Sequence, residues 1–271
     1  MFKNIIHNAN KYGAGVSSQD WLKFLAIITM TIDHIGWCFV PDSSPYYAWF
    51  RTIGRIHVPI WFFFAGYSVK NQEFDKQLLC CALLLIAVNL LGGRAIAPLN
   101  VLCSIIIARY CVIWLNRKNM IPNRILDIFI ICLIFSPFTQ TLFEYGTLGV
   151  LYAVMGNMVR KGFNVSFKHK MFFVASFALF TAYQYVGVQP NAIQATIMIV
   201  GLGYYSWRLA HFEMRALPWF EAHPTCSYAV RLFGRNTLYY YTIHRSIFVL
   251  ASYYGGFYVV NQYKLLGLFG W

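Results

Sequence analysis

Charged residues are scarce in this 271-residue chain: Asp, Glu, Lys and Arg together make up 11%, whereas soluble domains carry about 25%. Hydrophobic residues reach 59%, and the mean hydropathy is +0.52. A chain with so little charge cannot cover a globular core with a polar surface in water. The composition therefore excludes an ordinary water-soluble domain and predicts an integral membrane protein.

Acidic residues are scarcer still, with 9 Asp and Glu against 22 Lys and Arg and a formal net charge of +13. In a soluble protein such an excess would indicate nucleic-acid binding. Here the basic residues gather in short connections between apolar runs, which is the distribution that membrane topology produces. We therefore expect no nucleic-acid partner, and we expect the basic excess to face the headgroups of the lipid bilayer.

Signals for metal binding and for secretion are also missing. No HxxxH or HxxE spacing occurs, and the seven cysteines lack metal-ligand spacing. Asp33, His34, His57 and His244 have side chains that zinc accepts, but they belong to separate apolar runs, so we expect no metal site. Residues 1–20 contain no apolar run long enough for a cleavable signal peptide, so the first span is expected to direct insertion.

Apolar runs are what the sequence does contain. A membrane-crossing helix needs about 20 apolar residues, and nine candidate runs are separated by short connections. They are residues 21–40, 53–70, 77–92, 97–115, 124–138, 143–159, 171–188, 192–210 and 236–256. The predicted fold class is all-α: a polytopic transmembrane helical bundle of about nine spans, or eight to ten, in a single domain over residues 1–271.

The charges between the runs predict how the chain is oriented. With a cytoplasmic N-terminus, most Lys and Arg of the connections fall on the cytoplasmic side, around residues 70–76, 117–124, 160–170 and 208–235. The opposite connections hold few charges, as the positive-inside rule requires. The connection after residue 210 is expected to hold a short amphipathic helix at the membrane surface. Nine spans place the C-terminus on the opposite side, where the C-terminal YKLLGLFGW is expected to fold back into the membrane interface.

Ionisable residues inside the runs are few, and such residues mark functional sites in membrane helices. Lys23 and His34 are eleven residues apart, close to three helical turns, so they share one helix face with about 16 Å of axial rise between them. Asp33 lies about 100° around the helix from His34. We therefore expect Asp33 to pair with another helix, and Arg55 is the natural partner.

The second run carries Arg55 and His57 just before Pro59. A proline frees a backbone carbonyl and opens the helix locally, which a membrane tolerates where the opening is buried in protein or lines a cavity. An arginine beside such an opening suits an anionic group or a developing oxyanion. His57 is expected either to join this site or to face the outer interface.

Three stretches give these residues a family resemblance. LKFLAIITMTIDHIG at 22–36, RTIGRIHVPIWFFFAGYS at 51–68 and LYYYTIHRSIF at 238–248 together resemble the TraX family of pilin acetylases. The spacing of Lys23 and His34 also resembles the basic-x10-His motif of family-3 integral-membrane acyltransferases. The resemblance covers about residues 20–70 and 234–248. The positions on its pattern are Lys23, Asp33, His34, Gly54, Arg55, Pro59 and His244, while family members usually carry a small apolar residue in place of His57.

The resemblance implies a membrane-embedded acetyltransferase of the bacterial inner membrane. Such a protein takes acetyl from cytoplasmic acetyl-CoA and delivers it to an acceptor on the periplasmic side. By family expectation the acceptor is the N-terminal amine of a pilin subunit, which links the protein to conjugation. The implied partners are acetyl-CoA, the lipid bilayer and a pilin-like protein.

The implied site follows from the same residues. His34 would act as general base, and Arg55, held by Asp33, would stabilise the oxyanion. His244 would act as a second acid or base or as an acyl-carrying nucleophile. The residues expected to meet the CoA phosphates or line the donor path are Lys23, Arg109 and Arg245.

Other readings of the sequence stay open. The acceptor can be a cell-surface glycan, acetylated on oxygen or nitrogen. A proton-coupled transporter can use Asp33, His34 and Arg55 as a relay. In a non-enzymatic assembly protein, these charges and His244 would only join helices through hydrogen bonds and ion pairs. Lys23 can also extend to the membrane interface without binding a substrate.

Overall fold

The computed structural model describes residues 15–69, 75–163 and 166–256. Within these ranges the regular structure is helical, without a strand, apart from two isolated bridges that join Ser17 to Ala216 and Leu99 to Phe143. The predicted all-α class is therefore confirmed. The N-terminal residues 1–14 and the C-terminal YKLLGLFGW lie outside the described residues, so the expectations for both ends stay predictions, as does the single domain over 1–271.

The predicted apolar runs correspond to helices. The first run is α2 (Ser18–Phe39), and the second is divided into α3 (Tyr47–Gly54), the 3₁₀ turn η1 (Arg55–His57) and α4 (Val58–Tyr67). The later runs are α5 (Lys76–Leu91), α6 (Val101–Arg117), α8 (Ile125–Leu142), α9 (Gly146–Arg160), α10 (Phe167–Val188), α11 (Ala192–Ala210) and α13 (Thr237–Tyr254). The connections hold α7 (Met120–Asn123), η2 (Pro218–Glu221) and α12 (Pro224–Arg235), and α12 is the short helix expected after residue 210.

In the described part of the chain, three helices are long and apolar enough to cross a membrane: α2, α8 and α10. Among the other helices that correspond to predicted runs, α11 and α13 are at least as long as α8 and the rest are shorter. The 15 residues of α9 rise only about 22 Å, whereas the hydrocarbon core of a bilayer is about 30 Å thick. The structure thus supports a membrane protein, and the number of nine spans stays a prediction.

The second run differs from the continuous helix expected at 53–70. Helix α3 begins at Tyr47, and the path then breaks at η1 before α4 begins. Pro59 stands in the first turn of α4, where its missing N–H and ring interrupt the helical hydrogen bonds to the preceding turn. The backbone N–H of Val58 instead donates to Arg55 across the 3₁₀ turn. The local opening predicted from Pro59 is therefore present, and it contains Arg55 and His57.

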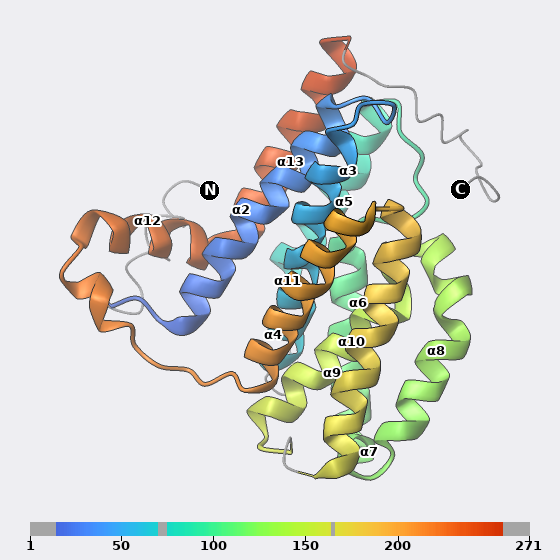
Figure 1. The fold of residues 1–271 in the computed structure, drawn as a ribbon, viewed down its shortest axis with the longest axis vertical. Coiled ribbons are helices and arrows are strands. Elements are labelled where there is room, and N and C mark those ends of the chain that lie inside the picture. The colour runs from blue at the N-terminus through green and yellow to red at the C-terminus, as the bar shows by residue number, and fades with distance from the viewer. Residues whose placement is uncertain (1–14, 70–74, 164–165, 257–271) are drawn as a thin grey trace.

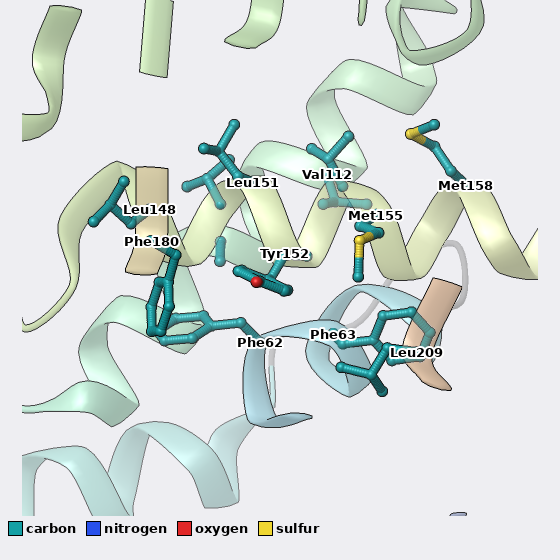
Figure 2. Close-up of a cluster of buried hydrophobic side chains, with 14 of the residues drawn as sticks. Phe62, Phe63, Val112, Leu148, Leu151, Tyr152, Met155, Met158, Phe180 and Leu209 are labelled. Carbon is teal, nitrogen blue, oxygen red and sulfur yellow. The ribbon is translucent and has the colours of Figure 1, made fainter. Parts of the chain in front are cut away.

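The main core lies where α4 packs against α9. Figure 2 shows Phe62 and Phe63 of α4 beside Leu148, Tyr152 and Met155 of α9, all of them buried. The two helix backbones approach closely at two glycines, because a Cβ on Gly66 would lie 1.8 Å from the Ala153 carbonyl oxygen. A Cβ on Gly156 would lie 2.0 Å from the Phe63 carbonyl oxygen. This contact fixes α4, and with it the turn η1 at its start.

Helix α2 runs beside α13, while α12 and η2 project from the bundle near the start of α2 (Figure 1). Ser17 caps α2 by accepting a hydrogen bond from the Asp20 backbone N–H, and Asp20 also forms an ion pair with Arg235 of α12 at 3.2 Å. Gly234 allows α12 to pack directly on the Asp20 backbone. These contacts fix α2 at its first turn, so its longer part stands between α3, α4 and α13.

Candidate functional site

A cavity of about 650 Å³ follows the length of α2. At one end it is lined by Lys23, Ser68, Asp75 and Arg109, which lie where α2 and α5 begin and where α4 and α6 approach their ends. At the other end it is lined by Trp37, Asp42, Arg94 and Gly187, near the α2–α3 and α5–α6 connections. Lys23 and Trp37 are separated by about 21 Å of helical rise, so the cavity extends along this part of α2.

Lys23 and His34 both line this cavity, in agreement with the helix face that their spacing predicts. The Lys23 ammonium lies 5.5 Å from the centre of the Phe64 ring. At the same end, the Arg109 guanidinium lies 3.7 Å from the Asp75 carboxylate. Two cations thus stand at the end of the cavity that the predicted topology places in the cytoplasm.

Asp33 is held by two arginines. Its Oδ1 lies 3.0 Å from Arg51 Nη1 and 3.6 Å from Arg55 Nε. The predicted pairing with Arg55 is therefore confirmed, but the closer partner is Arg51, which the sequence places in a connection and which belongs to α3. Gly54 makes this geometry possible, because a Cβ there would lie 2.3 Å from the Asp33 Cβ.

Arg55 has a second partner on α9. Its Nη1 donates a hydrogen bond to the Tyr145 hydroxyl. Tyr145 is the N-cap residue of α9 and has a positive φ of 67°, a conformation that turns the chain sharply from α8 into α9. Arg55 therefore links α2 to α9, because its guanidinium contacts both Asp33 and Tyr145.

His34 and His244 are in direct contact. His34 Nδ1 lies 2.7 Å from His244 Nε2, and His244 Nδ1 lies 2.8 Å from the Tyr240 carbonyl oxygen. On its other side, His34 Nε2 lies 3.4 Å from Arg245 Nη1. Both histidines are buried, and the two residues are 210 positions apart in the sequence.

Arg245 and the Tyr240 carbonyl stand at the two ends of this series of contacts. Their chemistry determines which nitrogen of each neutral imidazole carries the proton. A carbonyl oxygen only accepts, so His244 carries its proton on Nδ1 and presents the lone pair of Nε2 to His34. A guanidinium only donates, so His34 Nε2 carries a lone pair and His34 Nδ1 carries the proton. The basic nitrogen of His34 therefore points away from His244, toward Arg245.

Arg245 is positioned by Trp37 of α2 and by Glu144 of the α8–α9 connection. Its Nη2 lies 3.4 Å from Glu144 Oε1, and its guanidinium stacks over the Trp37 ring at 4.5 Å. The Arg94 guanidinium lies over the same ring at 3.5 Å. Sequence reasoning missed Trp37 and Glu144 as site residues, because the first reads as an ordinary apolar residue and the second falls in a short connection.

His57 is buried and lines the same cavity as His34. Its Nδ1–H donates to the Gly54 carbonyl within the η1 turn, which leaves Nε2 as the acceptor nitrogen. Of the two expectations for this residue, a position facing the outer interface is wrong. The His57 imidazole belongs to the cavity wall, as the His34 imidazole does.

These observations define the class of protein. It is a helical protein with helices able to cross a membrane, and it has a cavity between them that is lined by buried arginines and histidines. The TraX protein family matches residues 18–250, from the start of α2 into α13, and the chain belongs to that family. The match includes the middle helices that showed no sequence motif of their own.

A relative in Rickettsia prowazekii (strain Madrid E), the uncharacterized protein RP591, is 31% identical over 141 residues. The aligned part is 51% of this chain and 54% of the relative, so the chain spans about half the length of that protein. No solved structure matches the chain.

Proposed function

We propose that this protein is an acetyltransferase of the bacterial inner membrane that carries acetyl from cytoplasmic acetyl-CoA to a periplasmic acceptor. Within the TraX family, the proposed acceptor is the N-terminal amine of a pilin subunit. The observation that carries the proposal is the lone pair of His34 Nε2, which lies beside the Arg245 guanidinium in a cavity that extends along α2 from Lys23 to Trp37. A base and a cation side by side are what acyl transfer from a thioester needs.

The reaction proceeds by attack of the acceptor amine on the thioester carbonyl carbon. As the C–N bond forms, His34 Nε2 takes a proton from the amine nitrogen. The carbonyl oxygen becomes an oxyanion and is stabilised by the Arg245 guanidinium. The C–S bond then breaks, the thiolate of CoA leaves, and the proton on His34 passes to that sulfur. The products are the acetylated amine and CoA in its thiol form.

His244 supports His34 in this scheme. When His34 gains a proton on Nε2, its Nδ1–H still donates to His244 Nε2, and the Tyr240 carbonyl keeps that acceptor nitrogen in place. His244 thus fixes the orientation of the imidazole and shares its positive charge. A role for Arg55 as oxyanion donor stays a prediction, since Asp33 and Tyr145 occupy its guanidinium and Arg245 is the arginine on His34.

The donor is proposed to bind from the Lys23 end of the cavity. The Lys23 ammonium and the Arg109 guanidinium are the cations there that can meet the phosphates of CoA. The thioester then reaches His34 along the shared face of α2. This orientation assumes nine spans and a cytoplasmic N-terminus, as the charges of the connections predict.

The experiment is acetyl transfer by the purified protein in liposomes, with labelled acetyl-CoA and a synthetic pilin N-terminal peptide as acceptor. His34→Ala is expected to lower the rate by about 10²–10⁴-fold, the range that a general base contributes. The matched control is His223→Ala, because this histidine is exposed near α12. Transfer at the wild-type rate by the His34 variant would contradict the proposal.

A proton-coupled transporter is the second candidate, because the same cavity extends along α2 and is lined by ionisable groups. It predicts that wild-type liposomes conduct protons or exchange a solute without acetyl-CoA and without an acetylated product. A glycan can be added to the same assay as a competing acceptor. If the glycan is acetylated and the peptide is not, the proposed reaction stands and the proposed acceptor is replaced.

A further inference from the structure

Several residues that line the cavity carry a buried polar atom without a hydrogen-bond partner among the described residues, and two of these atoms belong to side chains of one apolar cluster. They are the hydroxyl oxygen of Tyr241 and the indole Nε1 of Trp61. Tyr241 is only 6% exposed, so its hydroxyl is shielded from bulk water as well. Buried polar groups are nearly always paired, and an unpaired one calls for a partner that binds there.

Both residues belong to an apolar part of the cavity wall. Tyr241 packs in a cluster with Met30, Leu78 and Leu102, and Trp61 packs against the same cluster. All of these side chains line the cavity between the Lys23 end and His34. The Tyr241 ring centre lies 5.7 Å from the His34 ring centre, so the hydroxyl is on the residue next to the proposed base.

This part of the cavity favours a ligand of defined chemistry. Its apolar walls suit a narrow aliphatic chain, because methylene groups gain from leaving water. Its two unpaired groups need polar atoms spaced along that chain: an acceptor for the Trp61 N–H, and a donor or an acceptor for the Tyr241 hydroxyl. A linear chain of methylenes interrupted by secondary amides meets these needs. The arm that joins the thioester of an acyl-CoA to its phosphates has this composition.

We propose that the Tyr241 hydroxyl hydrogen-bonds the secondary amide nearest the thioester of the donor, and that the Trp61 indole N–H donates to a carbonyl of the same arm. The inference rests on the proposed function and adds two binding residues to it. Tyr241 lies about one helical turn before His244 on α13. From this position it would place the thioester carbonyl beside His34. Lys23 and Arg109 would hold the far end of the same ligand.

The test is the affinity of the purified protein in lipid nanodiscs for radiolabelled acetyl-CoA, measured by equilibrium dialysis. Tyr241→Phe removes one hydroxyl and is expected to raise Kd by about 5- to 10-fold, as for one lost hydrogen bond. Tyr254→Phe is the matched control, because it removes a hydroxyl from the same helix at a side chain that is 73% exposed. An unchanged Kd in the Tyr241 variant would overturn the proposal.

Two short thioesters, used as competitors of acetyl-CoA, identify the contact. N,S-diacetylcysteamine keeps the amide nearest the sulfur, and S-pentyl thioacetate has methylenes in its place. Tyr241→Phe is expected to weaken the first and to leave the second unchanged. Equal weakening of both would mean that the ring position matters and the amide contact is absent, which would overturn the proposal.

Thermal stability separates this effect from misfolding. Tyr241→Phe removes a buried hydroxyl without a protein partner, so the Tm measured without donor is expected to stay the same or to rise. A lower Tm together with weaker binding would assign the hydroxyl to the fold and overturn the proposal. Failure of the wild-type protein to bind acetyl-CoA would instead overturn the proposed function, and this inference with it.

Discussion

At the scale of single residues, this molecule concentrates its buried charges around α2. Asp33 carries one negative charge between the guanidinium groups of Arg51 and Arg55. A buried carboxylate without such partners would be strongly unfavourable in an apolar environment. The ion pairs keep the residue before His34 fixed against α3, so they position the proposed base without contacting its ring.

Asp33→Ala would leave both guanidiniums without their shared carboxylate. Loss of one member of a buried ion pair costs about 3–5 kcal/mol, so the variant is expected to unfold at markedly lower temperature or denaturant concentration in detergent. Asp127→Ala is the control, since its pair with Arg124 is exposed and worth about 0–1 kcal/mol. Equal stability losses in the two variants would contradict the structural role of the Asp33 pairs.

Some of these residue contacts follow from the sequence. The shared face of Lys23 and His34 depends only on helical periodicity, and the pairing of Asp33 with Arg55 of η1 follows from the direction of Asp33 on α2. The contact of His34 with His244 could not be predicted, because it depends on how α2 packs against α13. Arg51 and Glu144 were missed for a related reason: both read as residues of connections and are turned inward by the helix ends that carry them.

At the scale of elements, the break at η1 explains why the second apolar run carries polar side chains. In a continuous α-helix, the side chains of Arg55 and His57 would point about 160° apart around the helix axis. The 3₁₀ turn instead brings both side chains to the cavity. Pro59 made this break predictable, whereas the early beginning of α3 at Tyr47 was not, since residues 47–52 lie outside the expected run.

The position of η1 in turn depends on the close contact of α4 with α9. Gly66→Ala would place a Cβ 1.8 Å from the Ala153 carbonyl oxygen, and a backbone atom cannot move aside as a flexible side chain does. We expect a loss of stability of about 1–3 kcal/mol, as for overpacking in a core, together with reduced acetyl transfer. Gly203→Ala in α11 is the matched control, because its Cβ would meet Phe177 at an ordinary distance of 3.6 Å. A Gly66 variant as stable as the Gly203 variant would contradict this packing.

At the scale of the whole molecule, the cavity has two ends that differ in their connections. The Lys23 end lies near α12 and near the junction of α4 with α5, and the Asp42 end lies near the connections α2–α3 and α5–α6. The order of helices follows from the apolar runs of the sequence, but a cavity between them depends on packing and has no sequence signal. Only the positive-inside rule supports the part of the proposal that places the Lys23 end on the cytoplasmic side.

Cysteine labelling tests that orientation. Cys226 is an exposed cysteine on α12, at the end that the proposed function places in the cytoplasm, and Ser43 is an exposed residue of the α2–α3 connection. In intact cells with a permeabilised outer membrane, an impermeant maleimide is expected to label Ser43→Cys and not Cys226. Disruption of the inner membrane should expose Cys226, and a Cys226→Ser protein gives the background from the other six cysteines. The reverse pattern would place Lys23 on the periplasmic side, away from acetyl-CoA, so the donor could not reach His34 along α2 in the proposed direction.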